Sequence, residues 1–170
     1  MQLLEIILQK QSKRNCEAII HWIGNNQARF DELFMHYEHG DNRTKQNSSW
    51  PLSYCVQHHP FFIKKYIAII IQILINPTTQ ISVKRNTIRL LQFVDIPKKH
   101  QGILMEICFT YIQNIQEKPA IKASALIVLE KLSNIYPEIL PELQLIIQEQ
   151  MPHETKAFTS IGKLILHKKI

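Results

Sequence analysis

The stretch that decides the fold is Ser82-Val-Lys-Arg-Asn-Thr-Ile-Arg-Leu-Leu-Gln-Phe-Val94. Five of its residues recur at the spacing of one helix face, and these are Val83, Thr87, Leu90, Leu91 and Val94. Three basic residues, Lys84, Arg85 and Arg89, point away from that face. The stretch therefore predicts an amphipathic helix with one buried side and one basic side.

The same offsets recur along the chain, which indicates an internal repeat. Ile121, Ala125, Val128, Leu129 and Leu132 repeat the apolar face, and Lys122 takes the place of Lys84. Further matches are weaker in identity but keep the pattern, and they place Lys13-Arg14 near the N-terminus, Thr44-Lys45 in the next unit and Lys156 in the last one. Each repeat has room for two helices.

Prolines mark the other helix of each pair. Pro60, Pro97 and Pro137 each precede an apolar segment that leads into a repeat helix, and proline is tolerated in a first helical turn because its missing N–H would be unpaired there. Pro51 is the exception, since it lies inside a predicted helix, where we expect a kink that Trp50 fills. The map has ten helices, at residues 2–11, 13–24, 26–39, 42–58, 60–75, 80–95, 97–116, 119–135, 137–150 and 153–168.

Such pairs cannot bury both faces alone, so they stack into a continuous core. We therefore predict an all-α fold, a right-handed α-solenoid of about five antiparallel helix pairs, in a single domain over residues 1–170. The composition agrees: 45% hydrophobic residues exclude a disordered chain, and four glycines are too few for the many turns of an all-β fold.

The chain shows no signal of export or of a membrane. Glu5 lies among the first apolar residues, which does not resemble a secretory signal. The apolar run from Tyr66 to Ile75 is about half of the roughly 20 residues that a spanning helix needs. Cys16, Cys55 and Cys108 are far apart and odd in number, so no disulfide framework is indicated. A reduced, cytoplasmic protein is expected.

The chain resembles HEAT repeats in its paired helices, in the prolines that open first helices and in the Val83-Lys-Arg segment that opens a second helix. Asp41, ahead of Thr44-Lys45, also matches an Asp that HEAT units often have at that place. The segments Trp50-Pro-Leu-Ser-Tyr-Cys55 and Val83-Lys-Arg-Asn86 are similar to a group of short bacterial HEAT-like proteins. Gln80 and Lys118 depart from the pattern, because they stand where later units usually have Asp. The resemblance covers nearly the whole chain, and because its motifs are structural, it implies the fold far more specifically than a function.

Proteins of that group are sometimes labelled adenylosuccinate lyase. Those lyases resemble a helical bundle more than twice this length, with a mobile loop rich in Gly and Ser that carries a catalytic serine. No such loop is present in a chain with four glycines. We therefore predict no enzyme activity, no catalytic residue and no cofactor.

Basic residues concentrate in the middle of the chain. Nine of them lie between Arg43 and Lys99, where Asp95 is the only acid. Because second helices line the concave face of a HEAT-like array, the basic residues of the repeat could form one stripe, and a groove of one charge sign concentrates anionic partners. The predicted binding residues are Lys13, Arg14, Lys45, Lys84, Arg85, Arg89, Lys122 and Lys156. The alternative is that these side chains bond to neighbouring repeats or are simply solvated.

Three other kinds of site have less support in the sequence: a metal site, a cysteine nucleophile and a DNA glycosylase site. His36 and His39, with Cys55, His58 and His59, could hold a metal only if they converged, and solvated histidines at helix ends are the simpler interpretation. The cysteines occupy apolar positions and are expected in the core. HEAT-like DNA glycosylases combine a basic groove with aromatic residues and an acid, a role imaginable for Trp22, Trp50 and Asp41, but both tryptophans suit core positions.

The sequence therefore predicts a non-enzymatic scaffold that binds a protein partner with an acidic segment, without a membrane. The alternative is a nucleic-acid-binding module, with DNA repair as a candidate process, that uses the same basic stripe. The two differ because peptide capture needs apolar anchor pockets between the basic residues. Whether Tyr37, Tyr54 or Phe93 provides such an anchor is left open, as is the oligomeric state.

Overall fold

A computed structural model describes residues 2–168 of the protein, which contain ten α-helices and no strand. The helices group into two compact units, Met1–Asp95 and Ile96–Ile170. The predicted all-α solenoid of about five helix pairs is confirmed. The single domain predicted over residues 1–170 stays a prediction.

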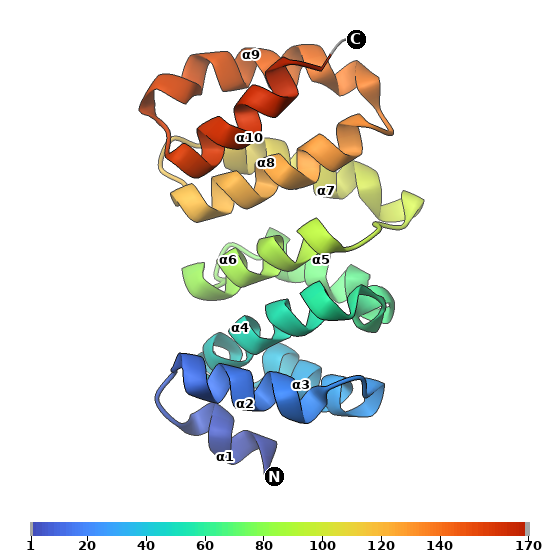
Figure 1. The fold of residues 1–170 in the computed structure, drawn as a ribbon, viewed down its shortest axis with the longest axis vertical. Helices are drawn as coiled ribbons and strands as arrows, with labels where there is room; N and C mark the ends of the chain where they lie inside the picture. Colours follow the sequence, from blue (N-terminus) through green and yellow to red (C-terminus); the bar gives the residue numbers. More distant parts are fainter. Residues whose placement is uncertain (1, 169–170) are drawn as a thin grey trace. The chain divides into compact units, whose positions relative to one another are not determined.

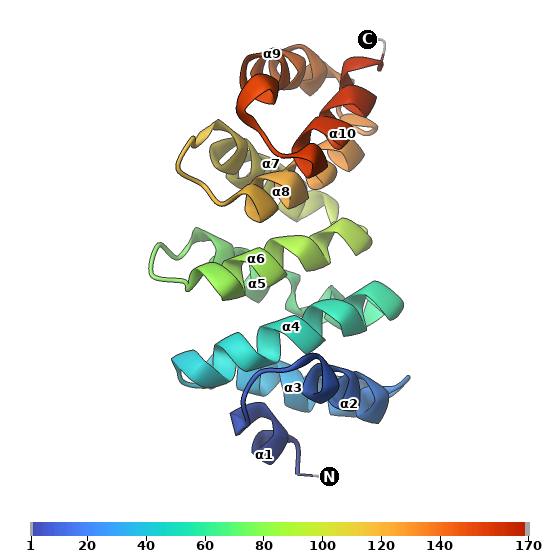
Figure 2. The ribbon, with the colours of Figure 1, turned by 60° about the vertical axis from the view of Figure 1, so that its left-hand side comes forward.

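The first unit contains three helix pairs. The first helices are α1 (Leu3–Leu8), α3 (Gln27–His39) and α5 (Ile67–Ile75), and α5 follows the 3₁₀ segment Pro60–Tyr66. The second helices are α2 (Lys13–Ile23), α4 (Asn42–His58) and α6 (Ile81–Leu90), which is extended by a 3₁₀ turn at Leu91–Phe93. The second helices stack side by side, with α4 between α2 and α6 (Figures 1 and 2).

The second unit contains two helix pairs. α7 (Lys98–Gln113) packs against α8 (Pro119–Ser133). α9 (Leu140–Gln150) follows a 3₁₀ turn at Pro137–Ile139 and packs against α10 (Lys156–Leu166), which follows another 3₁₀ turn at Met151–His153. The second helices α8 and α10 are again neighbours (Figure 1).

Local sequence explains where several helices begin. The side chains of Ser12, Asn26 and Asp41 accept hydrogen bonds from backbone N–H groups three residues later, at 2.8–3.1 Å. These N-caps satisfy donors that the first helical turn leaves unpaired. Gly40 precedes the Asp41 cap because a Cβ there would lie 2.5 Å from the Thr44 side chain and from the His36 carbonyl oxygen. Ser12 and Asp41 thus begin the second helices α2 and α4, whereas α6 begins after Gln80 without a side-chain cap.

The predicted helices agree with the structure within a few residues, and the differences lie at the ends. The first helix is shorter than predicted, and the last begins at Lys156 rather than at residue 153. The predicted helix 60–75 is 3₁₀ up to Tyr66. Helix α4 continues across the buried Pro51 as one helix. The kink predicted at Pro51 is not tested by these observations and stays a prediction.

Candidate functional site: the basic second helices

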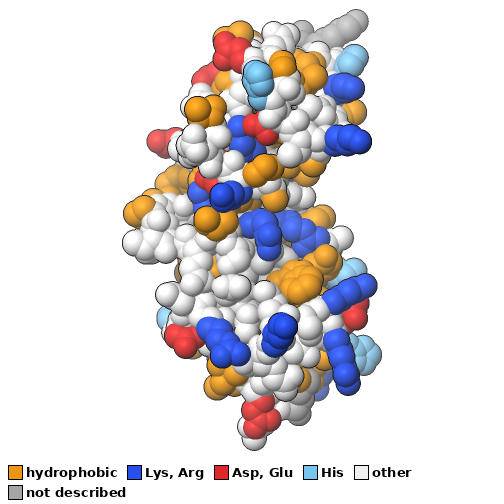
Figure 3. All heavy atoms as spheres, turned by 90° about the vertical axis from the view of Figure 1, so that its left-hand side faces the viewer, with side chains coloured by type: hydrophobic (Ala, Val, Ile, Leu, Met, Phe, Trp, Pro, Cys, Tyr) orange, Lys and Arg blue, Asp and Glu red, His pale blue; other side chains and the backbone are white. Residues whose placement is uncertain are grey.

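Six of the eight predicted binding residues lie on the three second helices of the first unit. Lys13 and Arg14 are on α2, Lys45 is on α4, and Lys84, Arg85 and Arg89 are on α6. Lys13, Arg14 and Arg85 are exposed, whereas Lys45, Lys84 and Arg89 are half-buried. Figure 3 shows Lys and Arg side chains around a hydrophobic patch on this unit, in the lower half of the view. The structure therefore places these six residues on one layer of helices.

Arg89 is the most closely held of these cations. Its guanidinium donates hydrogen bonds to Ser53 Oγ at 2.9 Å and to Gln57 Oε1 at 2.8 Å, both on α4. The guanidinium carbon lies 4.3 Å from the ring centroid of Tyr54 and 5.7 Å from that of Phe93. These partners are uncharged, so they orient Arg89 without neutralising it.

A pocket opens between α2 and α4, beside Arg89. Its volume is about 450 Å³, within the range of about 300–1,000 Å³ that is usual for ligand sites. Cys16 and Ile20 on α2, with the half-buried rings of Trp50 and Tyr54 on α4, form its apolar lining. The remaining lining residues are polar or charged, and they are Lys13, Glu17, His21 and His58.

The thiol of Cys16 contributes an apolar surface to this pocket and is not an activated nucleophile. Burial, helped by the nearby Glu17 carboxylate, raises the pKa of Cys16 to about 12, although Arg89 acts in the opposite direction. The thiol is therefore neutral at physiological pH. Burial also raises the pKa of Cys55 to about 12. All three cysteines are buried, as predicted.

Lys45 lies at a second, more polar pocket of about 120 Å³. Tyr37, Gln80 and Val83 are among the residues that line this pocket with it. The Oε1 atom of Gln80 is buried and has no hydrogen-bond partner. Asp41 lies next to this region but serves as the α4 cap, where it accepts from the Thr44 N–H at 2.8 Å. Lys45 is therefore separate from the aromatic pocket that Lys13 lines.

The second unit uses its predicted cations differently. Lys122 is not on the surface: its side chain is 2% exposed and forms an ion pair with Glu154, with a hydrogen bond to Gln150 Oε1 at 2.5 Å. Its ammonium also lies 5.7 Å from the Phe158 ring centroid. Lys122 therefore binds a neighbouring repeat, which was the alternative open at its position, and it is not accessible to a partner. Lys156 is exposed in the first turn of α10.

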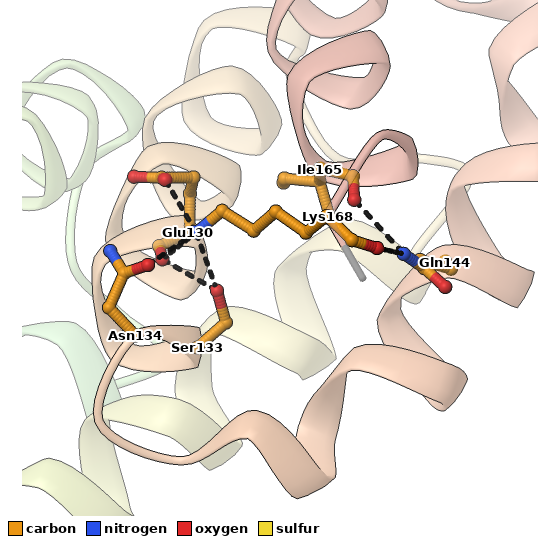
Figure 4. A network of polar contacts seen from close by, with 6 residues as sticks. All are labelled: Glu130, Ser133, Asn134, Gln144, Ile165 and Lys168. Atoms are coloured by element: carbon orange, nitrogen blue, oxygen red, sulfur yellow. Dashed lines mark hydrogen bonds and ion pairs between the residues drawn. The ribbon is translucent and has the colours of Figure 1, made fainter. Parts of the chain in front are cut away.

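Another lysine of the second unit, Lys168, is also bonded to groups of its own unit (Figure 4). Lys168 forms an ion pair with Glu130 at 2.7 Å and donates to Ser133 Oγ and Asn134 Oδ1 at the end of α8. Gln144 on α9 donates to the carbonyl oxygens of Ile165 and Lys168 at 3.0 and 3.1 Å. The network ties the end of α10 to α8 and α9, and its function is structural.

The nine central basic residues do not all lie on the second helices of the first unit. Lys64 and Lys65 lie in the 3₁₀ segment that precedes α5, and Lys65 pairs with Asp31 of α3 at 2.7 Å. Arg43 donates to the Leu8 carbonyl oxygen at 2.7 Å. Lys98 and Lys99 begin α7 in the other unit. The excess charge read from the sequence is therefore divided among several surfaces.

The geometry agrees with what similarity to known proteins shows. Residues 4–169 match the HEAT repeat domain family, which is nearly the whole chain. This protein is a HEAT repeat protein. Members of the family generally mediate protein interactions as non-catalytic scaffolds. No curated protein and no solved structure matches the chain.

Two further features bear on the site of this HEAT repeat protein. Within residues 2–168, no group of three or more His, Cys, Asp or Glu side chains is placed to hold a metal ion. By length and composition, no single described helix could cross a membrane, and one pair, Asn42–His58 with Pro60–Ile75, passes the same test only jointly and with a bend of 119°.

The sequence left open whether Tyr37, Tyr54 or Phe93 serves as an anchor, and it predicted Trp50 in the core. Tyr37 is fully buried, where its hydroxyl is 2.6 Å from Thr87 Oγ1, so it is no anchor. Tyr54 and Phe93 are half-buried beside Arg89, and Trp50 lines the pocket instead of lying wholly in the core. A sequence signal did exist, because Trp50 and Tyr54 are spaced i, i+4 and share one face of α4.

Proposed function

We propose that this HEAT repeat protein is a non-enzymatic scaffold that binds an acidic segment of a protein partner through the second helices of its first unit. The observation that carries the proposal is the apolar pocket between α2 and α4, with Lys13 on its lining and Arg89 beside Tyr54. Peptide capture needs such an anchor pocket next to the charges. Binding to phosphates alone needs only a diffuse array of charge.

The electrostatics of the first unit support an anionic partner. The partners of Arg89 are Ser53, Gln57 and two rings, none of which is an anion. Arg14 and Arg85 are exposed on the same layer of helices. Glu17 is the only acidic residue on the pocket, and Lys13 pairs with it at 3.6 Å. An acidic segment would therefore meet attraction at most points of this surface.

The proposal extends to the setting of the protein. Its thiols are buried and neutral, which suits a reduced cytoplasmic environment. It also assigns no catalytic role to the chain. The thiols have raised pKa values, so no cysteine is a ready nucleophile.

The test is binding of a labelled peptide rich in Asp and Glu, followed by fluorescence anisotropy at physiological salt. Reversing the α6 charges with Lys84→Glu, Arg85→Glu and Arg89→Glu should weaken binding at least about tenfold. The matched control, Lys64→Glu, Lys98→Glu and Lys99→Glu, changes the net charge equally at exposed residues off α2, α4 and α6. Circular dichroism checks that both variants fold. Equal weakening by both triples would contradict the proposal.

A short DNA duplex and its single strand are titrated in parallel. If DNA binding survives physiological salt and is lost in the α6 triple variant, the partner is a nucleic acid and not a protein. Half-buried rings beside an arginine can also stack on bases, so this outcome is a real alternative. DNA binding at low salt alone is generic for a basic surface and leaves the protein partner in place.

A further inference from the structure

The pocket between α2 and α4 has the features of an anchor site for one large apolar side chain. Its volume of about 450 Å³ is lined by Ile20, Cys16 and the rings of Trp50 and Tyr54. Trp50 and Tyr54 are only half-buried, so apolar ring surface remains open to the pocket. Aromatic walls of this kind contribute strongly to binding when a partner covers them.

Arg89 lies beside one wall of the pocket. Helix α4 lies between α2 and α6 (Figure 2), and the Arg89 guanidinium on α6 lies over the ring of Tyr54, which lines the pocket. Its bonds to Ser53 and Gln57 hold the guanidinium in place. A guanidinium has five N–H donors, so it can bind a carboxylate in addition. Because the group is already ordered, little conformational entropy is lost on binding.

The ring of Tyr54 sets the distance between the two subsites. The guanidinium is 4.3 Å from the ring centroid, and an apolar group in contact with the other face would add about 3.5–4 Å. The anchor and the guanidinium are then roughly 8 Å apart. In an extended peptide, side chains two residues apart lie on the same face and are separated by about 7 Å. A carboxylate two residues from the anchor therefore reaches Arg89.

The charges at the pocket disfavour a cationic ligand. Two rings and Glu17 would together suit a bound ammonium group, but Arg89 already lies over Tyr54 and Lys13 already pairs with Glu17. A second cation would meet both. Charge complementarity therefore selects a partner that is apolar at the anchor and acidic beside it.

We infer that this pocket holds one large apolar side chain of an extended acidic segment, and that Arg89 binds a carboxylate two residues away from that anchor. The inference rests on the proposed function and sharpens it, because it names the pattern that the partner must present. It adds Ile20, Trp50 and Tyr54 to the binding residues, none of which is charged. Arg89 is the residue that joins the anchor site to the basic surface.

The experiment compares three labelled peptides of equal length and charge. Gly-Asp-Ser-Phe-Ser-Asp-Gly has carboxylates two residues from the Phe anchor on both sides, so the direction of the chain does not matter. Gly-Ser-Asp-Phe-Asp-Ser-Gly has them one residue away, on the opposite face of an extended chain. A third peptide replaces Phe by Ala in the first sequence. We expect the first peptide to bind at least about tenfold more tightly than either of the others.

A pocket-filling variant gives an independent readout. Ile20→Trp places a larger side chain on the half-buried pocket lining and should remove the preference for Phe over Ala. Leu145→Trp adds the same residue at an exposed position of α9 and should keep the preference. Arg89→Gln should remove the difference between the two Phe peptides while it leaves the preference for Phe.

The outcomes separate this inference from the proposed function. If the Ala peptide binds as tightly as the Phe peptides and the α6 charge reversal abolishes that binding, the basic surface stands and the anchor pocket is overturned. Equal affinity of the two Phe peptides, or an Ile20→Trp variant with unchanged preference, also overturns the inference. If no acidic peptide binds the unmodified protein, both proposals fall.

Discussion

Arg89 in the first unit and Lys122 in the second are both basic residues of second helices, yet they have different roles. Arg89 is half-buried and bonded to uncharged groups of the neighbouring helix α4. Lys122 is buried and paired with Glu154, which lies just before α10. At these two positions the difference is the carboxylate of Glu154, which the neighbouring segment supplies to Lys122, whereas Arg89 is bonded to uncharged groups. The repeat alone does not decide between the two roles.

The largest expected effect comes from breaking the buried pair. Lys122→Met should lower the free energy of unfolding by about 3 kcal/mol or more, because Glu154 would be left partly buried without its cation. The control, Lys156→Met, removes an exposed lysine and should change the free energy by less than about 0.5 kcal/mol. Urea denaturation measures both. A loss below about 1 kcal/mol for Lys122→Met would show that the pair does not hold the second unit together.

A second variant would give Arg89 a carboxylate partner, as Lys122 has in Glu154. Gln57→Glu places a carboxylate where Gln57 Oε1 now accepts from Arg89 at 2.8 Å. Acidic peptides should then bind about three- to tenfold more weakly, because Arg89 would be paired internally. Stability should change by less than about 1 kcal/mol, since Gln57 is exposed. Unchanged peptide affinity would mean that the charge of Arg89 is not used in binding.

The network at the end of α10 should have an intermediate effect on stability. Lys168→Met removes the ion pair with Glu130 and the bonds to Ser133 and Asn134 (Figure 4). We expect a loss of about 1 kcal/mol, because the group is partly exposed to solvent. The matched variant Lys163→Met, at an exposed position of α10, should be neutral in the same thermal unfolding measurement. Equal effects of the two variants would mean that the bonds of Lys168 do not stabilise the second unit.

The smallest expected effect concerns the ion pair between Lys65 and Asp31 in the first unit. Burial acts to raise the pKa of Asp31, but hydrogen bonds from Lys65, Gln27 and Tyr66 outweigh it and lower the pKa below its usual value. The stabilisation is therefore complete above the unfolded-state pKa of about 4, and it is lost as the pH falls through the lower folded-state value.

In Asp31→Asn the free energy of unfolding should accordingly fall less steeply as the pH drops below about 4, and the difference from the unmodified protein should be less than about 1 kcal/mol. Urea midpoints measured across the acid range test this. The control Asp95→Asn changes an exposed carboxyl and should leave the limb unchanged. An unaltered limb in Asp31→Asn would mean that Asp31 and Lys65 are not coupled in solution.

Much of the fold could be predicted because helix periodicity and proline positions are local. The basic positions of α6 needed only a short window of sequence. The pocket could not be predicted in this way, because its walls come from α2 and α4 and depend on how two repeats pack. Asp31 with Lys65 and Arg89 with Ser53 are likewise contacts between repeats.

For Lys122 the sequence left two interpretations open, a binding residue and a residue bonded to the neighbouring repeat. Its position in the repeat matched Lys84, which placed it among the predicted binding residues. However, it lies in the run Ala120-Ile-Lys-Ala-Ser-Ala-Leu-Ile-Val-Leu129, which is apolar on nearly all sides. A helix of that kind is usually buried all round, and residues 121–126 are indeed all buried. A lysine within such a run indicates a buried partner, here Glu154.

The central claim is that the first unit, through α2, α4 and α6, carries the binding surface. The most direct test is to map backbone amide chemical shifts by NMR while the Phe-centred acidic peptide is titrated into the full chain. We predict saturable shifts in residues of α2, α4 and α6 around Ile20, Tyr54 and Arg89, with α8 and α10 unchanged. Shifts of equal size on α8 and α10, or none on the first unit, would contradict the account.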